Sequence, residues 1–198
     1  MPKVGMEPLR RQQLIDATLK VIDEVGLART TFALISKEAG MSTGIISHYF
    51  GNKKGLIDAT VRYLVSQLRV KGVYTDPLQR LMGIVDANFA PIQRSRASGR
   101  AWLSFWAQST QDADLHRLQQ INRKRLISNL TYSFRPLIPA EHVKEAAETT
   151  AALIDGLWLH CALEPERQEL FALHAKRCKV HIQRFLLQFA TSNNARER

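Results

Sequence analysis

The feature that most constrains this chain is its apolar periodicity, because almost every segment repeats its apolar residues at the spacing of an α-helix. From residue 15 to residue 25, isoleucine, leucine and valine recur every three or four positions, and Gly26 closes the run. No stretch of useful length shows the alternation of apolar and polar residues that is typical of a half-buried β-strand. We therefore predict an all-α fold of about nine helices.

Capping residues and prolines indicate where these helices begin and end. Thr30 or Thr31 and then Ser42 precede two short helices, and Asp76 followed by Pro77 is a strong start signal for another helix. Residues 93–99 are rich in polar side chains and are expected to form a loop. The remaining expected helices cover residues 53–71, 77–91, 99–110, 112–135, 140–163 and 166–191.

The composition is that of a globular protein with a basic surface. Hydrophobic residues make up 45 % of the 198 residues, so the chain can bury a sizeable core. It has no stretch long and apolar enough to span a membrane and no signal peptide, so we expect a soluble, cytoplasmic protein. The net charge of +10 favours a polyanionic partner, although an ordinary basic surface remains an alternative. Cys161 and Cys178 are expected to be reduced and packed, and no metal site is expected.

Two short predicted helices near the N-terminus are joined by a tight turn at Gly40 and Met41. Such a turn holds the second helix at a steep angle, so that this helix can enter the major groove of DNA. Two lysines begin the following helix, whose N-terminal amide groups favour a phosphate. The pattern predicts a helix-turn-helix, and a three-helix subdomain without a role in DNA binding stays open as the alternative.

The segment TTFALISKEAGMSTGIISHYFGNKKGL resembles the N-terminal signature of the TetR family of transcriptional regulators. The segments RRQQLIDATL, AWLSFW and AALIDGLWL extend the resemblance and are similar to the choline-responsive repressors of this family. The resemblance implies a DNA-binding domain over residues 1–52, with the helix-turn-helix at about 31–50, and a ligand-binding and dimerisation domain over residues 53–198. It also implies a homodimer, formed by the last two helices, that binds a palindromic operator in double-stranded DNA.

The resemblance further implies which side chains of the helix-turn-helix would meet DNA. Hydrogen-bonding groups on one side of the second helix would face the bases, while the isoleucines on its other side hold it to the core. Serine and histidine read bases less strongly than arginine or asparagine, which favours binding as a dimer. The base-facing residues would be Thr43, Gly44, Ser47 and His48, the phosphate contacts Thr31, Tyr49, Lys53 and Lys54, and Ser42 would allow a close approach to the duplex.

A second group of residues predicts a site for a small molecule. The aromatic residues of AWLSFW fall on one helix face, and Asp155 lies one turn before Trp158 in a very apolar helix. A carboxylate in such a place is costly unless an arginine, a backbone group or a bound cation meets it. Aromatic faces with an anion can bind a quaternary ammonium group, although an ordinary core stripe remains the alternative. The hypothesised choline-binding residues are Trp102, Phe105, Trp106, Asp155 and Trp158.

The resemblance thus predicts a repressor of choline uptake and glycine betaine synthesis, used for osmoprotection, with choline or a related quaternary ammonium compound as the inducer. A TetR-family repressor that responds to an amphipathic drug or a fatty acyl compound is the main alternative. A dimeric scaffold without a role in DNA binding is another. An enzyme is disfavoured, because the chain has no glycine-rich phosphate loop, nucleophile motif or metal-ligand spacing. No cofactor is expected.

Overall fold

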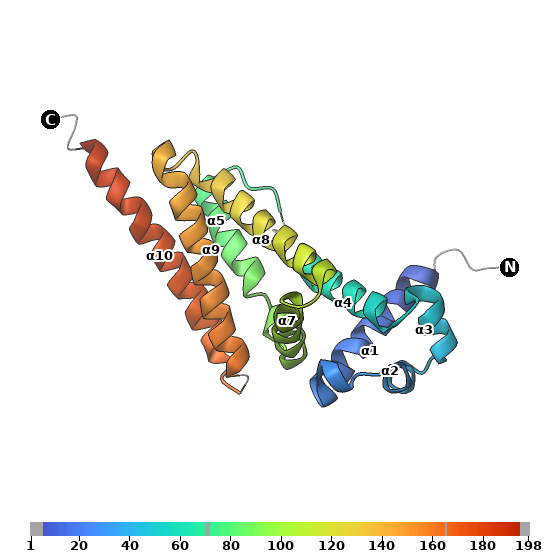
Figure 1. Cartoon of the computed structure of the whole chain (residues 1–198). Coiled ribbons are helices and arrows are strands. Elements are labelled where there is room, and N and C mark those ends of the chain that lie inside the picture. The colour runs from blue at the N-terminus through green and yellow to red at the C-terminus, as the bar shows by residue number, and fades with distance from the viewer. Residues whose placement is uncertain (1–5, 70–71, 165, 195–198) are drawn as a thin grey trace. The chain divides into compact units, whose positions relative to one another are not determined.

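A computed structural model describes residues 6–69, 72–164 and 166–194 of the chain (Figure 1). These residues form ten helical segments, of which α6 is a single turn, and no strand. The predicted all-α fold is confirmed. The segments are α1 Met6–Arg29, α2 Phe32–Ala39, α3 Thr43–Phe50, α4 Lys53–Gln67, α5 Pro77–Asn88, α6 Pro91–Arg94, α7 Arg96–Ser109, α8 Ala113–Phe134, α9 Ala140–Leu163 and α10 Glu169–Asn194.

Local capping explains where several helices begin and end. The side chains of Thr31, Ser42 and Asp76 accept hydrogen bonds from backbone N–H groups two or three residues further on, at 3.3, 3.4 and 2.9 Å. Such bonds satisfy amide groups that the first turn of a helix leaves unpaired. At the other end, Gly40 closes α2 with a left-handed φ of 61°, and Gly26 interrupts α1 with a φ of 77°. These are the positions that the sequence predicts.

Helix α4 is shorter than its sequence predicts. It ends at Gln67 instead of continuing to Lys71, and residues 70–71 of the expected helix lie outside the described residues. Near this end, the Ser66 hydroxyl donates a hydrogen bond to the Tyr63 carbonyl at 2.7 Å. A side-chain hydroxyl bound in this way competes with the helical hydrogen-bonding pattern, and no proline or glycine marks the position in the sequence.

The predicted polar loop over residues 93–99 is wrong. Helix α7 already begins at Arg96, because the Ser95 side chain accepts a hydrogen bond from the Ser98 N–H at 3.1 Å and caps it. Ser98 is only 1 % exposed. Arg96 reaches α1, where its Nε lies 3.0 Å from an oxygen of Asp23. A polar stretch can be helical and partly buried when its side chains form hydrogen bonds and ion pairs within the protein.

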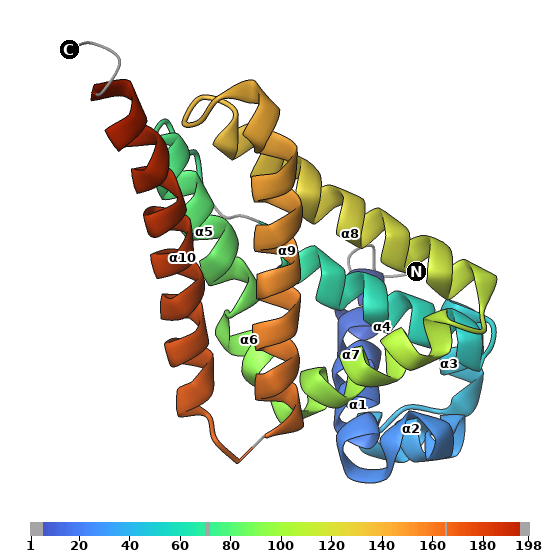
Figure 2. The same ribbon diagram turned by 60° about the vertical axis from the view of Figure 1, so that its left-hand side comes forward.

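The chain divides into two compact units, and each has its own core. Of the described residues, the first unit contains 6–67 and 95–116, and the second contains 68–69, 72–94, 117–164 and 166–194. Within the first unit, α1 packs against α2, α4 and α7, and α2 and α3 lie beside each other (Figures 1 and 2). The first unit thus also includes α4, which packs against α3, and α7, which packs against α1 and α4. The expected domain boundary after residue 52 stays a prediction.

The core of the first unit holds the helix-turn-helix in place. Ile35 from α2 and Ile46 from α3 are fully buried, as are Leu14 from α1 and Leu56 from α4. Burying an isoleucine or leucine side chain contributes about 1.5–3 kcal/mol relative to leaving it in water. Each short helix therefore depends on its packing partners and not on its own length for stability.

In the second unit, α9 and α10 lie side by side and pack with α5 (Figure 2). Helix α10 turns an apolar stripe towards this core, in which Phe171, Cys178 and Ile182 are buried. His174 is buried as well, and its Nδ1 donates to the Leu157 carbonyl at 2.9 Å. The prediction of packed thiols is also confirmed, since Cys161 and Cys178 are free and buried, and burial raises their pKa values to about 11 and about 12. Among the described helices, none combines the length and apolar character needed to cross a membrane.

Candidate nucleic-acid interface and ligand-binding residues

Helix α3 has one buried face and one polar face. Ile46 is fully buried and Phe50 is 9 % exposed, so these side chains attach the helix to the core of the first unit. Ser47 and His48 are exposed, together with Thr43 and Gly44 one turn earlier. The exposed positions are three or four residues apart and therefore lie on one side of the helix. This face carries hydroxyl and imidazole groups suited to hydrogen bonding with base edges.

The other predicted DNA-binding residues surround this face. Thr31 and Ser42 are exposed at the caps of α2 and α3, and Lys53 and Lys54 are exposed at the start of α4. Tyr49 is half-buried, and its ring packs edge-on against the His48 ring with centroids 5.3 Å apart. The predicted residues are thus accessible on the helix-turn-helix and at the start of α4, and their contacts with DNA stay a prediction.

Arg11 on α1 fixes the end of α3. Its Nη1 donates a hydrogen bond to the Tyr49 carbonyl at 3.0 Å, and its guanidinium lies 4.8 Å above the centre of the Phe50 ring. A cation is favourable at the C-terminal end of a helix and over an aromatic face. Arg11 therefore positions the predicted recognition helix. Sequence reasoning missed this role, because no local pattern links residue 11 to residues 49 and 50.

Two glycines near this surface differ in whether the fold has room for a side chain at their position. A Cβ atom at Gly55 would lie 2.1 Å from the Phe50 carbonyl oxygen, so the tight connection between α3 and α4 requires glycine there. A Cβ atom at Gly44 would meet only the Ser42 hydroxyl, at an ordinary 3.8 Å. The fold therefore does not require glycine at position 44.

Lys54 is held by the turn between α7 and α8. Its Nζ lies 3.1 Å from an oxygen of Asp112 and 2.8 Å from an oxygen of Asp114. These hydrogen bonds raise the pKa of Lys54 above its usual range. Asp112 also accepts hydrogen bonds from the N–H groups of Asp114 and Leu115, which lowers the pKa of its carboxyl. In this arrangement the charge of Lys54 is engaged by carboxylates, so a phosphate would have to compete for it.

Asp58 follows one turn after Lys54 on α4. Burial raises the pKa of its carboxyl, and one carboxyl oxygen is buried without a hydrogen-bond partner among the described residues. The positive charge of Lys54 opposes this rise, while Asp112 and Asp114 add to it. Lys54 is therefore a shared counter-charge for three carboxylates that link α4 to the start of α8.

The aromatic residues predicted to bind ligand form a cluster on α7, within the first unit. Trp102 and Phe105 are buried, and Trp106 is half-buried. The Trp102 ring centre lies 5.7 Å from that of Phe105 and 6.2 Å from that of Trp106. The structure thus brings these three predicted residues together. Much of their surface serves the core, as the alternative interpretation expected.

The other two predicted ligand residues, Asp155 and Trp158, lie on α9 in the second unit. Trp158 is buried. Asp155 is exposed, yet the protein around it excludes enough water to raise the pKa of its carboxyl to about 6, against the opposing charge of Arg123. Exposure measures direct access of water to the side chain, whereas the pKa also responds to the bulk of protein nearby. Asp155 is therefore a water-accessible carboxyl in a weakly polar setting.

The chain matches two family models that together cover most of its length. Residues 14–60 match the bacterial regulatory proteins of the tetR family, and residues 77–187 match the C-terminal model of BetI-type transcriptional repressors. The chain belongs to the TetR family, with a BetI-type C-terminal part. TetR-family regulators bind DNA and small-molecule effectors and form dimers. The predicted family is confirmed.

Curated relatives agree with this assignment. The HTH-type transcriptional regulator BetI of Klebsiella pneumoniae (strain 342) is 52 % identical over 170 residues, which cover 82 % of this chain and 87 % of that protein. The regulator of the same name from Yersinia pestis (strain Pestoides F) is 48 % identical over 185 residues, covering 88 % and 93 %. These relatives are transcriptional regulators, and such proteins are not enzymes.

Solved structures show the same fold at low sequence identity. A transcriptional regulator from Rhodococcus sp. RHA1 superposes with a TM-score of 0.73 at 20 % identity, covering 88 % of this chain and 96 % of that chain. A regulator from Saccharomonospora viridis, solved in complex with choline, has a TM-score of 0.71 at 20 % identity and covers 90 % and 96 %. The BetI-type repressor therefore has the TetR architecture along nearly its whole length.

Proposed function

We propose that this BetI-type repressor controls choline uptake and glycine betaine synthesis, and that choline or a related quaternary ammonium compound is its inducer. The DNA-binding part of the proposal rests on the polar, exposed face of α3 opposite the buried Ile46. Thr43, Gly44, Ser47 and His48 would meet bases there, and Thr31, Tyr49 and Lys53 would meet phosphates. Lys54 would join the phosphate contacts when Asp112 and Asp114 release it.

The observation that carries the choline proposal is the raised pKa of the Asp155 carboxyl. A carboxyl with a pKa of about 6 is only weakly solvated as an anion, so a nearby cation stabilises its charged form. A quaternary ammonium group also attracts the faces of tryptophan and phenylalanine rings. The names of the BetI relatives and the choline complex of the S. viridis regulator support this ligand class. The proposed choline contacts are Trp102, Phe105, Trp106, Asp155 and Trp158.

The homodimer is proposed to form through α9 and α10. Leu163 on α9 and Leu173 and Leu187 on α10 are 61 %, 41 % and 62 % exposed in the single chain. Large apolar side chains on two neighbouring helices favour burial against a second copy of the same surface. A symmetric pair would present two α3 helices to a palindromic operator, and the two linked contacts would strengthen binding.

Induction is proposed to act through the first unit. Helix α7 carries three of the proposed choline contacts, and the turn that follows it holds Lys54 through Asp112 and Asp114. A ligand that prefers one position of α7 would therefore bias the position of α4, which packs against α3. The expected result is weaker operator binding in the presence of choline.

Fluorescence anisotropy with DNA from upstream of the chain's own gene tests the proposal. We expect salt-sensitive, sequence-specific binding that choline weakens, with scrambled DNA of equal length as the control. Calorimetry with choline, betaine aldehyde and glycine betaine, and a parallel series with a fatty acyl compound, identifies the effector. Absence of specific DNA binding by a folded dimer would exclude the repressor function, whereas specific binding that only the acyl compound weakens would replace the choline assignment.

A further inference from the structure

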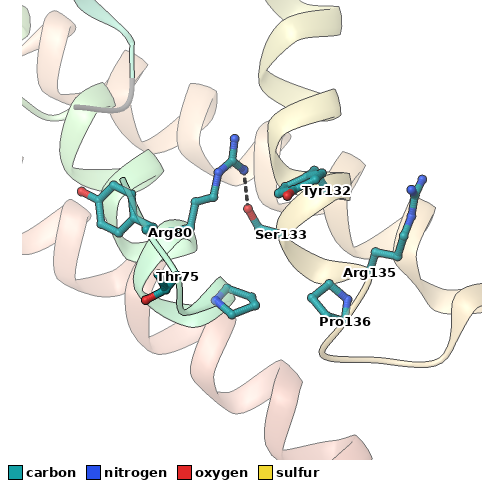
Figure 3. A pocket seen from close by; sticks show the side chains of 8 residues that line it. Thr75, Arg80, Tyr132, Ser133, Arg135 and Pro136 are labelled. Carbon is teal, nitrogen blue, oxygen red and sulfur yellow. Dashed lines mark hydrogen bonds between the residues drawn. The ribbon is translucent and has the colours of Figure 1, made fainter. Parts of the chain in front are cut away.

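A cavity of about 280 Å³ lies in the second unit, between the start of α5 and the end of α8. Figure 3 shows its lining, with Arg80 extending from α5 towards Ser133 on α8. Among the described residues of this lining, Arg80 and Arg135 carry a charge, and none is acidic. The nearby Asp76 uses its carboxylate to cap α5. The lining is therefore positively charged.

Arg80 is held in place entirely by neutral groups. Its Nη1 donates to the Asn129 carbonyl at 2.8 Å and to the Ser133 hydroxyl at 2.6 Å, and its Nη2 donates to the Asn129 side-chain oxygen at 2.8 Å. Its guanidinium also lies 4.9 Å from the centre of the Tyr132 ring. No carboxylate among the described residues forms an ion pair with Arg80 or Arg135. The half-buried charge of Arg80 is thus fixed in position without a counter-charge.

Arg80 keeps two N–H groups for a further hydrogen-bond acceptor, and its three hydrogen bonds hold these groups in place. A guanidinium has five N–H groups, and the three bonds to Asn129 and Ser133 leave the Nε–H and one Nη2–H for another acceptor. These two groups form the pair that a guanidinium presents to a carboxylate or phosphate. Thr75 and Tyr74 bring hydroxyl groups to the same lining. The tyrosine is seated against Gly83, where a Cβ atom would lie 2.5 Å from the Tyr74 hydroxyl oxygen.

We propose that this cavity is a binding site for a small oxyanion, either inorganic phosphate or the carboxylate of a small organic acid. Arg80 provides a preorganised bidentate contact, Arg135 adds a second positive charge at the exposed rim, and the hydroxyl groups donate further hydrogen bonds. This site goes beyond the proposed choline response, because its positive lining repels a quaternary ammonium cation. A second, anionic ligand would stabilise the second unit by binding its folded form.

Calorimetry on the full-length protein tests this site with sodium phosphate and sodium acetate in separate titrations at constant ionic strength, with sodium chloride as the blank. We expect saturable binding of at least one oxyanion, and the preferred one identifies the source. Arg135→Gln, whose side chain is exposed, should weaken that binding at least threefold, and Arg80→Gln at least tenfold. Arg117→Gln, which removes an exposed charge on α8 outside the cavity, should leave it unchanged.

Thermal unfolding separates loss of the site from loss of the fold. The preferred oxyanion should raise the melting temperature of the parent protein and of Arg117→Gln, and raise it less in Arg135→Gln. Because Arg80 joins α5 to α8, the Arg80 variant is informative only if it remains folded, and Arg135→Gln decides the question otherwise. Absence of saturable binding of both anions at millimolar concentration, or binding that neither arginine substitution weakens, would overturn the proposal.

Discussion

The Lys54 ammonium group lies 2.8 Å from an Asp114 carboxylate oxygen, although the two residues are far apart in the sequence. The pair joins the helix that follows the predicted recognition helix to the first turn of α8. Because both side chains are exposed, water and salt screen their attraction, and the pair adds little to stability. Its importance is positional, since it engages a lysine at the start of α4 that would otherwise be available to a DNA phosphate.

Asp114→Asn should make Lys54 more available to DNA. Asp114 is a better choice than Asp112 because Asp112 also caps α8. We expect tighter operator binding and a smaller effect of choline. The salt dependence of binding should also become steeper, by up to about one unit of slope for each additional phosphate that the protein neutralises. Anisotropy titrations at several salt concentrations measure all three. Glu145→Gln removes the same charge from an exposed site on α9, and an equal effect there would show that only net charge matters.

Gly44→Ala should separate DNA binding from folding. The added methyl group has room in the free protein, and alanine stabilises a helix by up to about 1 kcal/mol relative to glycine. Thermal unfolding should therefore show unchanged or higher stability. If α3 approaches DNA as proposed, the methyl group will meet the duplex and operator affinity should fall about tenfold or more, which corresponds to about 1.4 kcal/mol.

Gly55→Ala is the matched control for this glycine substitution. Its Cβ atom would collide with the Phe50 carbonyl, so both stability and DNA binding should fall. Equal DNA binding by Gly44→Ala and the parent protein would argue against a close approach of α3 to the duplex.

Substitutions on the exposed face of α3 should change specificity and affinity in different ways. His48→Ala and Ser47→Ala should each lose about 1–3 kcal/mol of discrimination between the operator and single-base variants, because they remove contacts to base edges. Lys53→Gln should instead weaken binding to all sequences and reduce the salt slope by about one per subunit. Competition assays with a panel of operator variants distinguish the two patterns, and a uniform loss for His48→Ala would assign it to the phosphate backbone.

Choline binding should depend on pH through Asp155. With a pKa of about 6, the carboxyl is mostly protonated at pH 5 and mostly ionised at pH 7.5, so affinity for a cation should rise about tenfold between these values. Calorimetry at the two pH values measures this change. Asp155→Asn should bind choline more weakly and with little dependence on pH, and a similar pH dependence in that variant would place the titrating group elsewhere.

The raised pKa of Asp155 affects protein stability in the opposite direction, because stability should fall as the pH rises while choline affinity increases. A carboxyl that holds its proton more tightly when folded stabilises the folded state at low pH, and this contribution is complete below its ordinary pKa of 3.8. It is lost as the pH rises to about 6. Choline should restore stability above that pH, because it compensates the charge that ionisation leaves on Asp155.

Leu173→Asp together with Leu187→Asp should prevent dimerisation. These side chains are exposed in the single chain, so the substitutions should leave the fold of one subunit intact but place charges in the proposed α9 and α10 interface. Sedimentation measurements should show a monomer, and operator affinity should fall sharply. Leu9→Asp changes an equally exposed leucine on α1 as a control, and a persistent dimer in the double variant would locate the interface elsewhere.

Much of the helical framework is determined by the sequence alone, because its signals act over short distances. Periodic apolar residues define each helix face, and the caps at Thr31, Ser42 and Asp76 bond to amides two or three residues away. For the same reason the sequence predicts which side of α3 is exposed. The buried position of Ile46 and the exposed positions of Ser47 and His48 follow from helical spacing.

Only the tertiary structure decided which distant groups satisfy one another. Part of the polar stretch over residues 93–99 is helical, because Ser95 caps α7 and Arg96 forms an ion pair with Asp23. No local sequence pattern predicts these partners. The contact of Arg11 with the end of α3 and the carboxylates around Lys54 arise in the same way. Local periodicity and capping specify elements through neighbouring residues, whereas ion pairs, buried polar groups and shifted pKa values depend on side chains that folding alone brings together.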